Sequence, residues 1–264
     1  MTLLKQIHKG REPKPPRIML TGVEGIGKST WAASAPHPIF IQTEDGLDQI
    51  DCHKFPLAKS FGDVMGALSD LYSEKHAYQT VVIDSLDRLE LLVWDEVCRQ
   101  HGAKSIEKAD GGYGRGYVHA LTHWREVVEG LEALRNDRGM AVILIAHVRV
   151  ERFQDPESTA YDRYAPRLHK HACALLVEWV DAVLFATRKF RTETEDAGFG
   201  RERTIAAPVG ADGGERILRT VGSPTCVAKN RYGLPAELPL SWPALMQALA
   251  GESQSDTNPE PEEA

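Results

Sequence analysis

The sequence predicts a single α/β domain, in which helices flank a mostly parallel, twisted sheet that has an antiparallel extension near the C-terminus. Three observations predict it. Short apolar segments rich in β-branched residues alternate with segments of helical periodicity. The apolar segments are continuous, which is typical of strands buried on both faces of a parallel sheet. A glycine-rich phosphate-binding pattern follows the first strand, and 264 residues suffice for one large core.

The elements follow in order along the chain. Strands bounded by turn or polar residues are predicted at 17–21, 38–42, 80–84 and 140–147. Apolar residues at helical spacing predict helices at about 86–101 and 117–136, and a glycine-rich flexible loop at 111–117. The remainder predicts a helix within 167–180, a strand within 181–189, and antiparallel strands around 215–221 and 224–230. We expect residues 17–250 to form the domain.

Charge is spread unevenly along the chain. The net charge is −7, but residues 251–264 carry five acidic residues and no basic one, which leaves about −2 for the rest. We expect a disordered acidic tail at 251–264 and a basic N-terminal arm at 1–16. Acidic composition therefore does not exclude a nucleic-acid partner.

Apolar runs and cysteines indicate the compartment. No apolar run approaches the roughly 18–20 residues of a membrane-spanning helix, and the N-terminal segment has no signal-like apolar core. The four cysteines are scattered without a CxxC pair, which favours reduced thiols. We expect a cytoplasmic protein that has no membrane partner.

The segment "GVEGIGKS" fits the phosphate-loop pattern G-x-x-x-x-G-K-[ST] at every fixed position, between a predicted strand and a predicted helix. The expected nucleotide contacts are Gly22, Val23, Glu24, Gly25, Ile26, Gly27, Lys28, Ser29 and the following Thr30. Backbone N–H groups surround the phosphates, Lys28 adds a positive charge, and Ser29 offers a hydroxyl to Mg²⁺. ATP and Mg²⁺ are therefore the expected cofactors.

Two carboxylates complete the predicted site. Asp84 ends the strand 80–84, and we expect that strand to lie beside the phosphate-loop strand and to direct Asp84 at Mg²⁺. The next residue is Ser85, which cannot act as the base that hydrolysis needs. Glu44 lies just past the end of the strand 38–42, at the edge where open α/β sheets bind ligands. Glu44 is therefore the candidate base.

The order of these motifs resembles the RecA recombinase core, from about residue 17 to residue 240. The segments "YGRGY", "IAHV" and "AKNRYGLP" further resemble compact phage and prophage RecA-like ATPases, which include single-strand annealing proteins. The resemblance implies that Glu44 is catalytic, that His147 senses phosphate, and that the protein is a homo-oligomer with ATP at subunit interfaces. Lys229 and Arg231 would then reach the nucleotide of the neighbouring subunit.

Each of these assignments has a plainer alternative, and three departures from RecA make strand exchange and filament formation doubtful. His147 stands where RecA has glutamine, and we expect a short N-terminal arm and no separate C-terminal domain. The alternative for His147 is a polar cap on the sheet, but its position beside the expected phosphate site favours the sensor role. Lys229 and Arg231 could be ordinary hairpin charges.

The resemblance also implies two DNA-facing loops, at about 104–117 and 148–170. Their basic and aromatic residues suit phosphates and stacked bases of single-stranded DNA. The candidates are Lys104, Lys108, Tyr113, Arg115 and Tyr117 in the first loop, and Arg149, Arg152, Arg163 and Arg167 in the second. Four acidic residues dilute the second loop, so a mixed-charge surface lid is the alternative.

The expected function is a slow, Mg²⁺-dependent and DNA-modulated ATPase that acts on single-stranded DNA in phage recombination or annealing. A phage-encoded protein would work in the host cytoplasm, and a single-strand binding protein is a possible partner. The first alternative is a nucleotide-gated protein-interaction module, such as a helicase loader. A small-molecule kinase is a third reading, which the lack of an obvious acceptor site disfavours.

Overall fold

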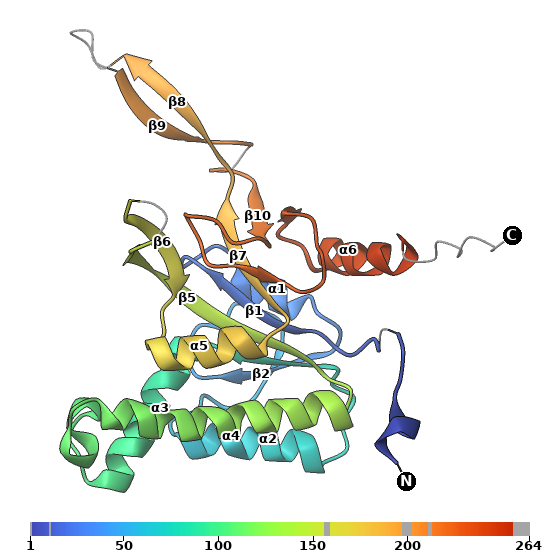
Figure 1. Ribbon diagram of the computed structural model, residues 1–264, viewed down its shortest axis with the longest axis vertical. Coiled ribbons are helices and arrows are strands. Elements are labelled where there is room, and N and C mark those ends of the chain that lie inside the picture. The colour runs from blue at the N-terminus through green and yellow to red at the C-terminus, as the bar shows by residue number, and fades with distance from the viewer. Residues whose placement is uncertain (1, 11, 156–158, 197–201, 211–212, 256–264) are drawn as a thin grey trace, which may run out of the picture.

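The computed structural model describes the chain except for residues 1, 11, 156–158, 197–201, 211–212 and 256–264. It confirms a mixed α/β fold with a mostly parallel sheet between two layers of helices (Figure 1). The helices are η1 (Leu3–Gln6), α1 (Lys28–Ala33), α2 (Phe61–Ser73), α3 (Leu86–His101), η2 (Ile106–Gly111), α4 (Arg115–Asp137), α5 (Lys170–Trp179) and α6 (Trp242–Ser255).

The main sheet has the strand order β12-β10-β7-β1-β5-β4-β2-β3. Its strands are β1 (Arg17–Gly22), β2 (Pro38–Gln42), β3 (His53–Lys54), β4 (Thr80–Asp84), β5 (Ala141–Phe153), β7 (Ala182–Arg188), β10 (Arg216–Arg219) and β12 (Glu237–Pro239), with β6 (Tyr161–Pro166) and β11 (Lys229–Asn230) attached to β5 and β7. Strands β2, β4, β5, β1 and β7 are parallel, whereas β10 and β11 pair antiparallel with β7. The antiparallel extension near the C-terminus is thus confirmed.

One expected neighbour relation is wrong, because β5 lies between β1 and β4. The register pairs Gly22 of β1 with His147 of β5, and Asp84 of β4 with Ile145 of β5. The carboxyl ends of β1 and β4 therefore lie at one sheet edge, on either side of β5 near His147. The phosphate loop and Asp84 can approach each other only across β5 at this point.

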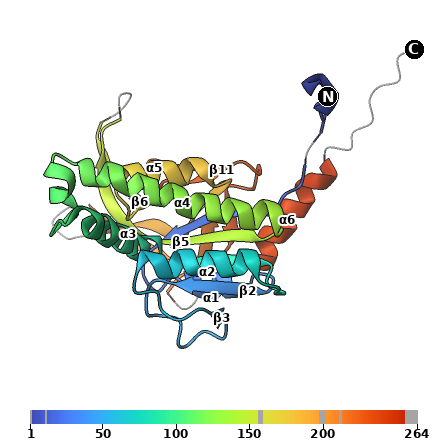
Figure 2. The same cartoon turned by 90° about the horizontal axis from the view of Figure 1, so that it is seen from below.

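Two apolar cores cover the two faces of the sheet. On one face, α2, α3, α4 and α5 pack on residues such as Met19, Ile83 and Leu144. On the other face, α1 and α6 pack on Leu20, Val82 and neighbouring strand residues. Helices α3 and α4 lie side by side in both views (Figure 2).

Several segments differ from the sequence expectation. Helix α2, which starts with a Ser60–Asp63 capping box, was not predicted, nor was the hairpin of β8 (Phe190–Asp196) and β9 (Glu202–Pro208), which projects away from the sheet (Figure 1). The expected loop 148–170 is largely the β5–β6 hairpin. The expected acidic tail starts inside α6, which ends at Ser255, and residues 256–264 lie outside the described residues.

The expected glycine-rich loop at 111–117 consists of the end of η2, a short turn and the first residues of α4. Helix η2 runs to Gly111 and α4 begins at Arg115, so only a short turn separates them. A Cβ placed at Gly116 would lie 2.1 Å from the carbonyl oxygen of Ile106, because the first turn of α4 touches η2. Ile106 and Ala109 are buried in the core.

No helix in the described part of the chain is both long and apolar enough to cross a bilayer.

A buried carboxylate joins α3 to the start of α5. Glu90 is 5% exposed, and its two oxygens accept hydrogen bonds from the backbone N–H of His169 at 2.9 and 3.0 Å. Burial raises the pKa of Glu90 from its ordinary value of 4.5 to about 7. The folded state therefore binds this proton more tightly than the unfolded state does.

Glu90→Gln is expected to remove a pH dependence of stability. In the wild type, the contribution of Glu90 is fully present below about pH 4.5 and is lost as the pH rises through about 7. Glutamine keeps an acceptor for His169 and carries no charge. The free energy of unfolding of the variant, measured in urea, should therefore rise relative to the wild type between pH 5 and pH 8. The exposed Glu129→Gln on α4 is the control, and parallel pH profiles for all three proteins would contradict the assignment.

Candidate nucleotide-binding and catalytic site

The phosphate loop connects β1 to α1 as the sequence predicts. Gly25 and Gly27 adopt φ values of 73° and 104°, which glycine tolerates and other residues rarely adopt. The ammonium group of Lys28 donates hydrogen bonds to the carbonyl oxygens of Gly22 and Val23, both at 3.0 Å. Burial lowers the pKa of Lys28, and the nearby carboxylates of Asp84 and Glu24 oppose that shift. The loop thus holds a buried cation beside its own backbone.

Ser29 and Asp84 meet at the sheet edge where β1 and β4 end. The hydroxyl of Ser29 donates a hydrogen bond to Asp84 Oδ2 at 2.6 Å. Burial raises the pKa of Asp84, and the hydrogen bond from Ser29 opposes this rise. A hydroxyl and a carboxylate are oxygen ligands of the kind that Mg²⁺ prefers, and they border a cavity with room for phosphate oxygens and water. These residues fit Mg²⁺.

Ser85, which cannot itself act as the base, positions the Glu44 carboxylate. The hydroxyl of Ser85 donates to Glu44 Oε2 at 2.9 Å. Thr43 fixes both strand ends, because its N–H donates to the carbonyl of Asp84 at 2.8 Å and its hydroxyl to that of Ser85 at 2.6 Å. The Glu44 carboxylate, 36% exposed, lines the cavity from just past the end of β2, the strand next to β4.

His147 belongs to a charged cluster that the sequence reading did not include. Its Nδ1 lies 3.1 Å from Asp87 Oδ1 and 3.9 Å from Glu44 Oε2. Arg167 Nη2 donates to the other oxygen of Asp87 at 2.7 Å, and Arg167 Nη1 lies 3.5 Å from Glu24 of the phosphate loop. Burial opposes ionisation of Asp87, but the bonds from His147 and Arg167 outweigh it and lower the pKa of the carboxyl.

The cavity between these groups measures about 280 Å³. Its lining residues are Gly25, Gly27, Lys28, Ser29, Thr30, Glu44, Gly46, Leu47, Ile50, Asp84 and His147. The structure thus brings Lys28, Ser29, Glu44, Asp84 and His147 together at one sheet edge. A nucleotide phosphate chain there would meet a cation, two oxygen ligands for a metal, and a carboxylate that can orient water.

Sequence reasoning missed four residues around this cavity: Thr43, Ser85 as a positioning group, Asp87 and Arg216. Asp87 could have been found, because it lies in the first turn of α3, three residues after Asp84. Arg216 of β10 approaches the loop from 190 residues away, with Nη1 3.5 Å from the carbonyl oxygen of Ile26. No local sequence pattern predicts that contact.

Lys229 and Arg231 lie near the start of β7, at the sheet edge opposite to the one that holds this cavity. Lys229 of β11 pairs with Val183 near the start of β7, whereas the phosphate loop follows the end of β1. The Lys229 ammonium donates to the carbonyls that end α5, those of Val177, Glu178 and Val180, at 2.6–2.8 Å. Lys229 is therefore a helix-capping residue. Arg231, 52% exposed, lies 3.7 Å from Asp181.

In the expected first DNA loop, the structure separates packed residues from exposed ones. Tyr117 stacks on His169 at a centroid distance of 4.1 Å, and its edge packs on Trp94, so this ring is not free for bases. Tyr113 is fully exposed, and the side chain of Arg115 is 63% exposed. Lys104 and Lys108 lie in the same segment and are also exposed.

In the expected second DNA loop, the arginines of the β5–β6 hairpin are paired. Arg163 Nη2 lies 2.9 Å from Glu151 and its guanidinium covers the ring of Phe153. Arg149 and Arg152 lie 3.5 and 3.7 Å from acidic residues and remain 45% and 67% exposed. Arg167 bonds to Asp87 and lies near Glu24, beside the nucleotide cavity, and its side chain remains 47% exposed.

The chain is similar to a known protein family and to a curated protein. A profile described as AAA domain matches residues 14–232. The SPbeta prophage-derived uncharacterized protein YorG of Bacillus subtilis (strain 168) is 25% identical over 183 residues, 68% of this chain and 52% of that protein. The chain therefore spans about half the length of this relative. Because the matched residues make up most of the chain and contain the whole cavity, the protein belongs to the AAA domain family.

Proposed function

We propose that the protein is a RecA-like, Mg²⁺-dependent ATPase of phage type that acts on single-stranded DNA in recombination or annealing. The observation that carries the proposal is the path of β5. This strand places His147 in the nucleotide site and continues without a break to Phe153 in the exposed hairpin. The strand that carries the proposed phosphate-contacting residue therefore extends to the surface at which we propose that DNA binds.

The hydrolytic part of the proposal assigns one role to each residue. Lys28 turns from the loop carbonyls to the phosphates, and Ser29 and Asp84 would hold Mg²⁺, which neutralises charge on the phosphate oxygens. Glu44 orients water for attack on the γ-phosphate and accepts its proton. A catalytic carboxylate just past the end of β2, rather than directly after Asp84, is the arrangement that the RecA resemblance implies.

The hairpin is tied to the site at both ends, which supports coupling between nucleotide and DNA. His147 is the last buried residue of β5 before the hairpin, and the N–H of Arg167, just after β6, donates to the carbonyl of His147 at 2.9 Å. Both side chains bond to Asp87. When a γ-phosphate competes for His147 or Arg167, the bonds that fix the hairpin change.

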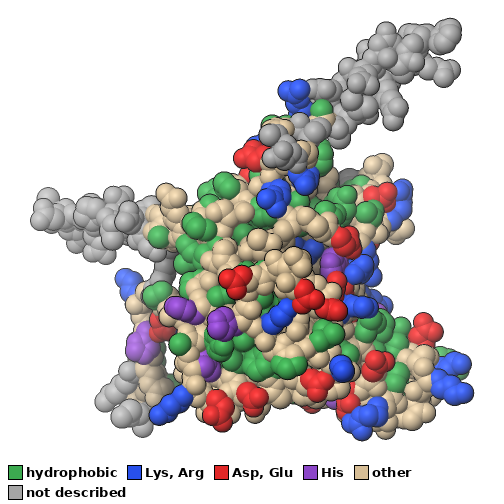
Figure 3. Space-filling model, turned by 180° about the vertical axis from the view of Figure 1, so that it is seen from behind, with side chains coloured by type: hydrophobic (Ala, Val, Ile, Leu, Met, Phe, Trp, Pro, Cys, Tyr) green, Lys and Arg blue, Asp and Glu red, His purple; other side chains and the backbone are tan. Residues whose placement is uncertain are grey.

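The proposed DNA surface combines the hairpin with the segment 104–117. Arg149 and Arg152 supply the exposed cations of the hairpin, while the other segment offers Lys104, Lys108 and the exposed ring of Tyr113. Acidic and basic side chains are interspersed on the face shown in Figure 3. Such mixed charge fits weak contact without sequence preference better than a strong basic groove.

We further propose a homo-oligomer in which Arg231 faces the nucleotide of a neighbouring subunit. Arg231 lies at the opposite sheet edge from the phosphate loop of its own chain, so contact with a nucleotide requires a second copy. A cation supplied in trans stabilises charge in phosphoryl transfer. The prophage origin of the curated relative supports the phage assignment.

The test measures binding of unstructured oligo(dT) by fluorescence anisotropy, with Mg²⁺ and either ADP or a non-hydrolysable ATP analogue. We expect the ATP analogue to tighten DNA binding by a factor of about 5–150, the usual range of coupling between two sites. His147→Ala should reduce this factor to near one. Arg149→Ala combined with Arg152→Ala should weaken DNA binding in both nucleotide states.

Arg125→Ala is the matched control, because Arg125 is an exposed arginine of α4 outside the proposed surface. Loss of DNA affinity in this control to the same extent as in the hairpin variant would contradict the surface. Equal coupling in the wild type and in His147→Ala would contradict the proposed path.

A nucleotide-gated protein-interaction module without DNA contact is the second candidate. The ion pairs of Arg163 with Glu151 and of Arg152 with Asp162 favour it, because they reduce the positive charge that the hairpin offers to phosphates. Two results would favour this function. Oligo(dT) would leave the rate of ATP turnover unchanged, and ATP would leave the anisotropy of oligo(dT) unchanged.

A further inference from the structure

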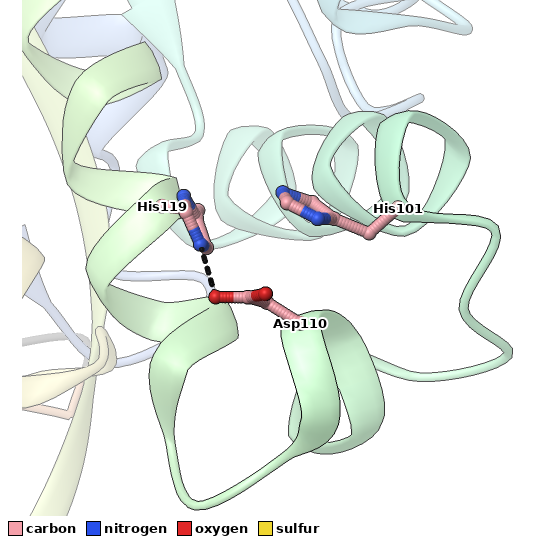
Figure 4. Close-up of side chains that lie close together, drawn as sticks. All are labelled: His101, Asp110 and His119. Atoms are coloured by element: carbon pink, nitrogen blue, oxygen red, sulfur yellow. Dashed lines mark hydrogen bonds and ion pairs between the residues drawn. The ribbon is translucent and has the colours of Figure 1, made fainter.

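We propose that His101, Asp110 and His119 form a binding site for Zn²⁺ or a similar divalent transition metal. Three elements meet there: the last residue of α3, the end of η2 and the second turn of α4 (Figure 4). The site lies apart from the nucleotide cavity and does not depend on the function proposed above. None of these three residues lines that cavity.

The three side chains already face one another. His119 Nε2 lies 3.0 Å from Asp110 Oδ2, and the two imidazole rings have centroids 4.4 Å apart (Figure 4). One potential ligand atom from each residue lies within 4.8 Å of those from the other two. Since Zn–N and Zn–O bonds are about 2.0–2.2 Å long, one ion can reach all three atoms after small side-chain rotations.

The backbone fixes the three donors in relation to one another. Gly102 ends α3 with φ of 59° directly after His101. Asp110 itself has φ of 51°, which is uncommon for a residue other than glycine and turns its side chain out of the 3₁₀ helix. The buried Ile106 and Ala109 anchor η2, and the close approach of Gly116 to Ile106 fixes η2 against α4.

The donor set selects the class of metal. Two imidazoles and one carboxylate match zinc and other borderline metals, whereas Mg²⁺ and Ca²⁺ prefer oxygen ligands alone. His101 and Asp110 are exposed and His119 is half-buried, so water has access to a fourth position.

Bound metal would join the end of α3, η2 and the start of α4. The segment 102–114 would then be fixed by coordination bonds in addition to its two buried side chains. Because metal binds only the arranged donors, it stabilises the folded state by mass action. Arg115, whose Nη1 lies 4.0 Å from Asp110 Oδ2, is the nearest competing cation.

The test uses the full chain, free of affinity tags and treated with a chelator, in buffer without nucleotide because phosphates bind Zn²⁺. Competition with a chromophoric chelator measures Zn²⁺ affinity, and Mg²⁺ serves as the comparison ion. We expect His101→Ala combined with His119→Ala to lower Zn²⁺ affinity at least about tenfold, and Asp110→Asn to lower it in the same direction. Zn²⁺ should also raise the Tm of the wild type but not that of the double variant.

Three controls isolate the site. His8→Ala removes an exposed histidine elsewhere, and His147→Ala removes the other cluster of possible metal ligands, formed with Glu44 and Asp87. Both should keep wild-type Zn²⁺ affinity, and Arg115→Gln should keep or raise it. Circular dichroism checks that each variant is folded. Equal Zn²⁺ affinity in the wild type and the folded double variant, or a comparable loss in His147→Ala alone, would overturn the proposal.

Discussion

Glu44→Gln is expected to lower the rate of ATP turnover by about 10²–10⁴-fold, the usual contribution of a positioned general base. Glutamine has nearly the same shape and can still accept the hydrogen bond from Ser85, so the site should keep its geometry. It cannot accept a proton from water. ATP affinity, measured with a fluorescent analogue, should change little, because the ground-state phosphates rest on Lys28 and the loop.

Asp45→Asn is the matched control, since Asp45 is the exposed carboxylate next in the chain. Its turnover should equal that of the wild type. Turnover in Glu44→Gln within about threefold of the wild type would exclude Glu44 as the base, given the size of the effect that a base contributes. Loss of nucleotide affinity in the variant would instead assign Glu44 to binding.

Lys28→Ala is expected to weaken ATP binding by about 10–100-fold and to abolish measurable turnover. A hydrogen bond to a charged group contributes about 1.5–3 kcal/mol, and here the cation is buried beside the expected phosphate position. The loop itself should persist, because Ser29 and Asp84 remain bonded and Gly25 and Gly27 keep their conformation. The loss should therefore reflect phosphate contacts rather than misfolding.

Isothermal titration with ATP and Mg²⁺ measures this loss, and a thermal melt of the free protein checks the fold. Lys75→Ala, an exposed lysine near the end of α2, is the control and should bind ATP as the wild type does. Wild-type affinity in Lys28→Ala would show that ATP does not bind in this cavity.

Local sequence patterns predicted the parts of the fold that depend on local chemistry. The strands β1, β2 and β4 and the helices α3 and α4 lie within a few residues of their expected bounds, because continuous apolar runs and helical spacing determine them. The phosphate loop follows from its glycines, and Glu44 and Asp84 follow from where parallel strands end.

Long-range pairing accounts for what the sequence could not predict. The position of β5 between β1 and β4 depends on contacts across the whole sheet. Arg167 bonds to Asp87 across 80 residues, and Arg216 reaches the loop across 190, so neither appears in any short pattern. The aromatic ring of Tyr117, in a glycine-rich segment, suggested stacking on DNA bases. It packs instead on Trp94 of α3 and on His169 at the start of α5, which are distant in the sequence.

The Asp87 carboxylate has a consequence for how ligands would influence each other. It accepts bonds from both ends of the β5–β6 hairpin, and Arg167 also approaches Glu24 of the phosphate loop. If nucleotide binding redistributes these bonds and changes the affinity for DNA, DNA binding must change the affinity for the nucleotide by the same factor, because coupling free energies are reciprocal. If ATP tightens a hold on DNA through this carboxylate, then DNA must slow the loss of ATP or speed its capture, by the same overall factor.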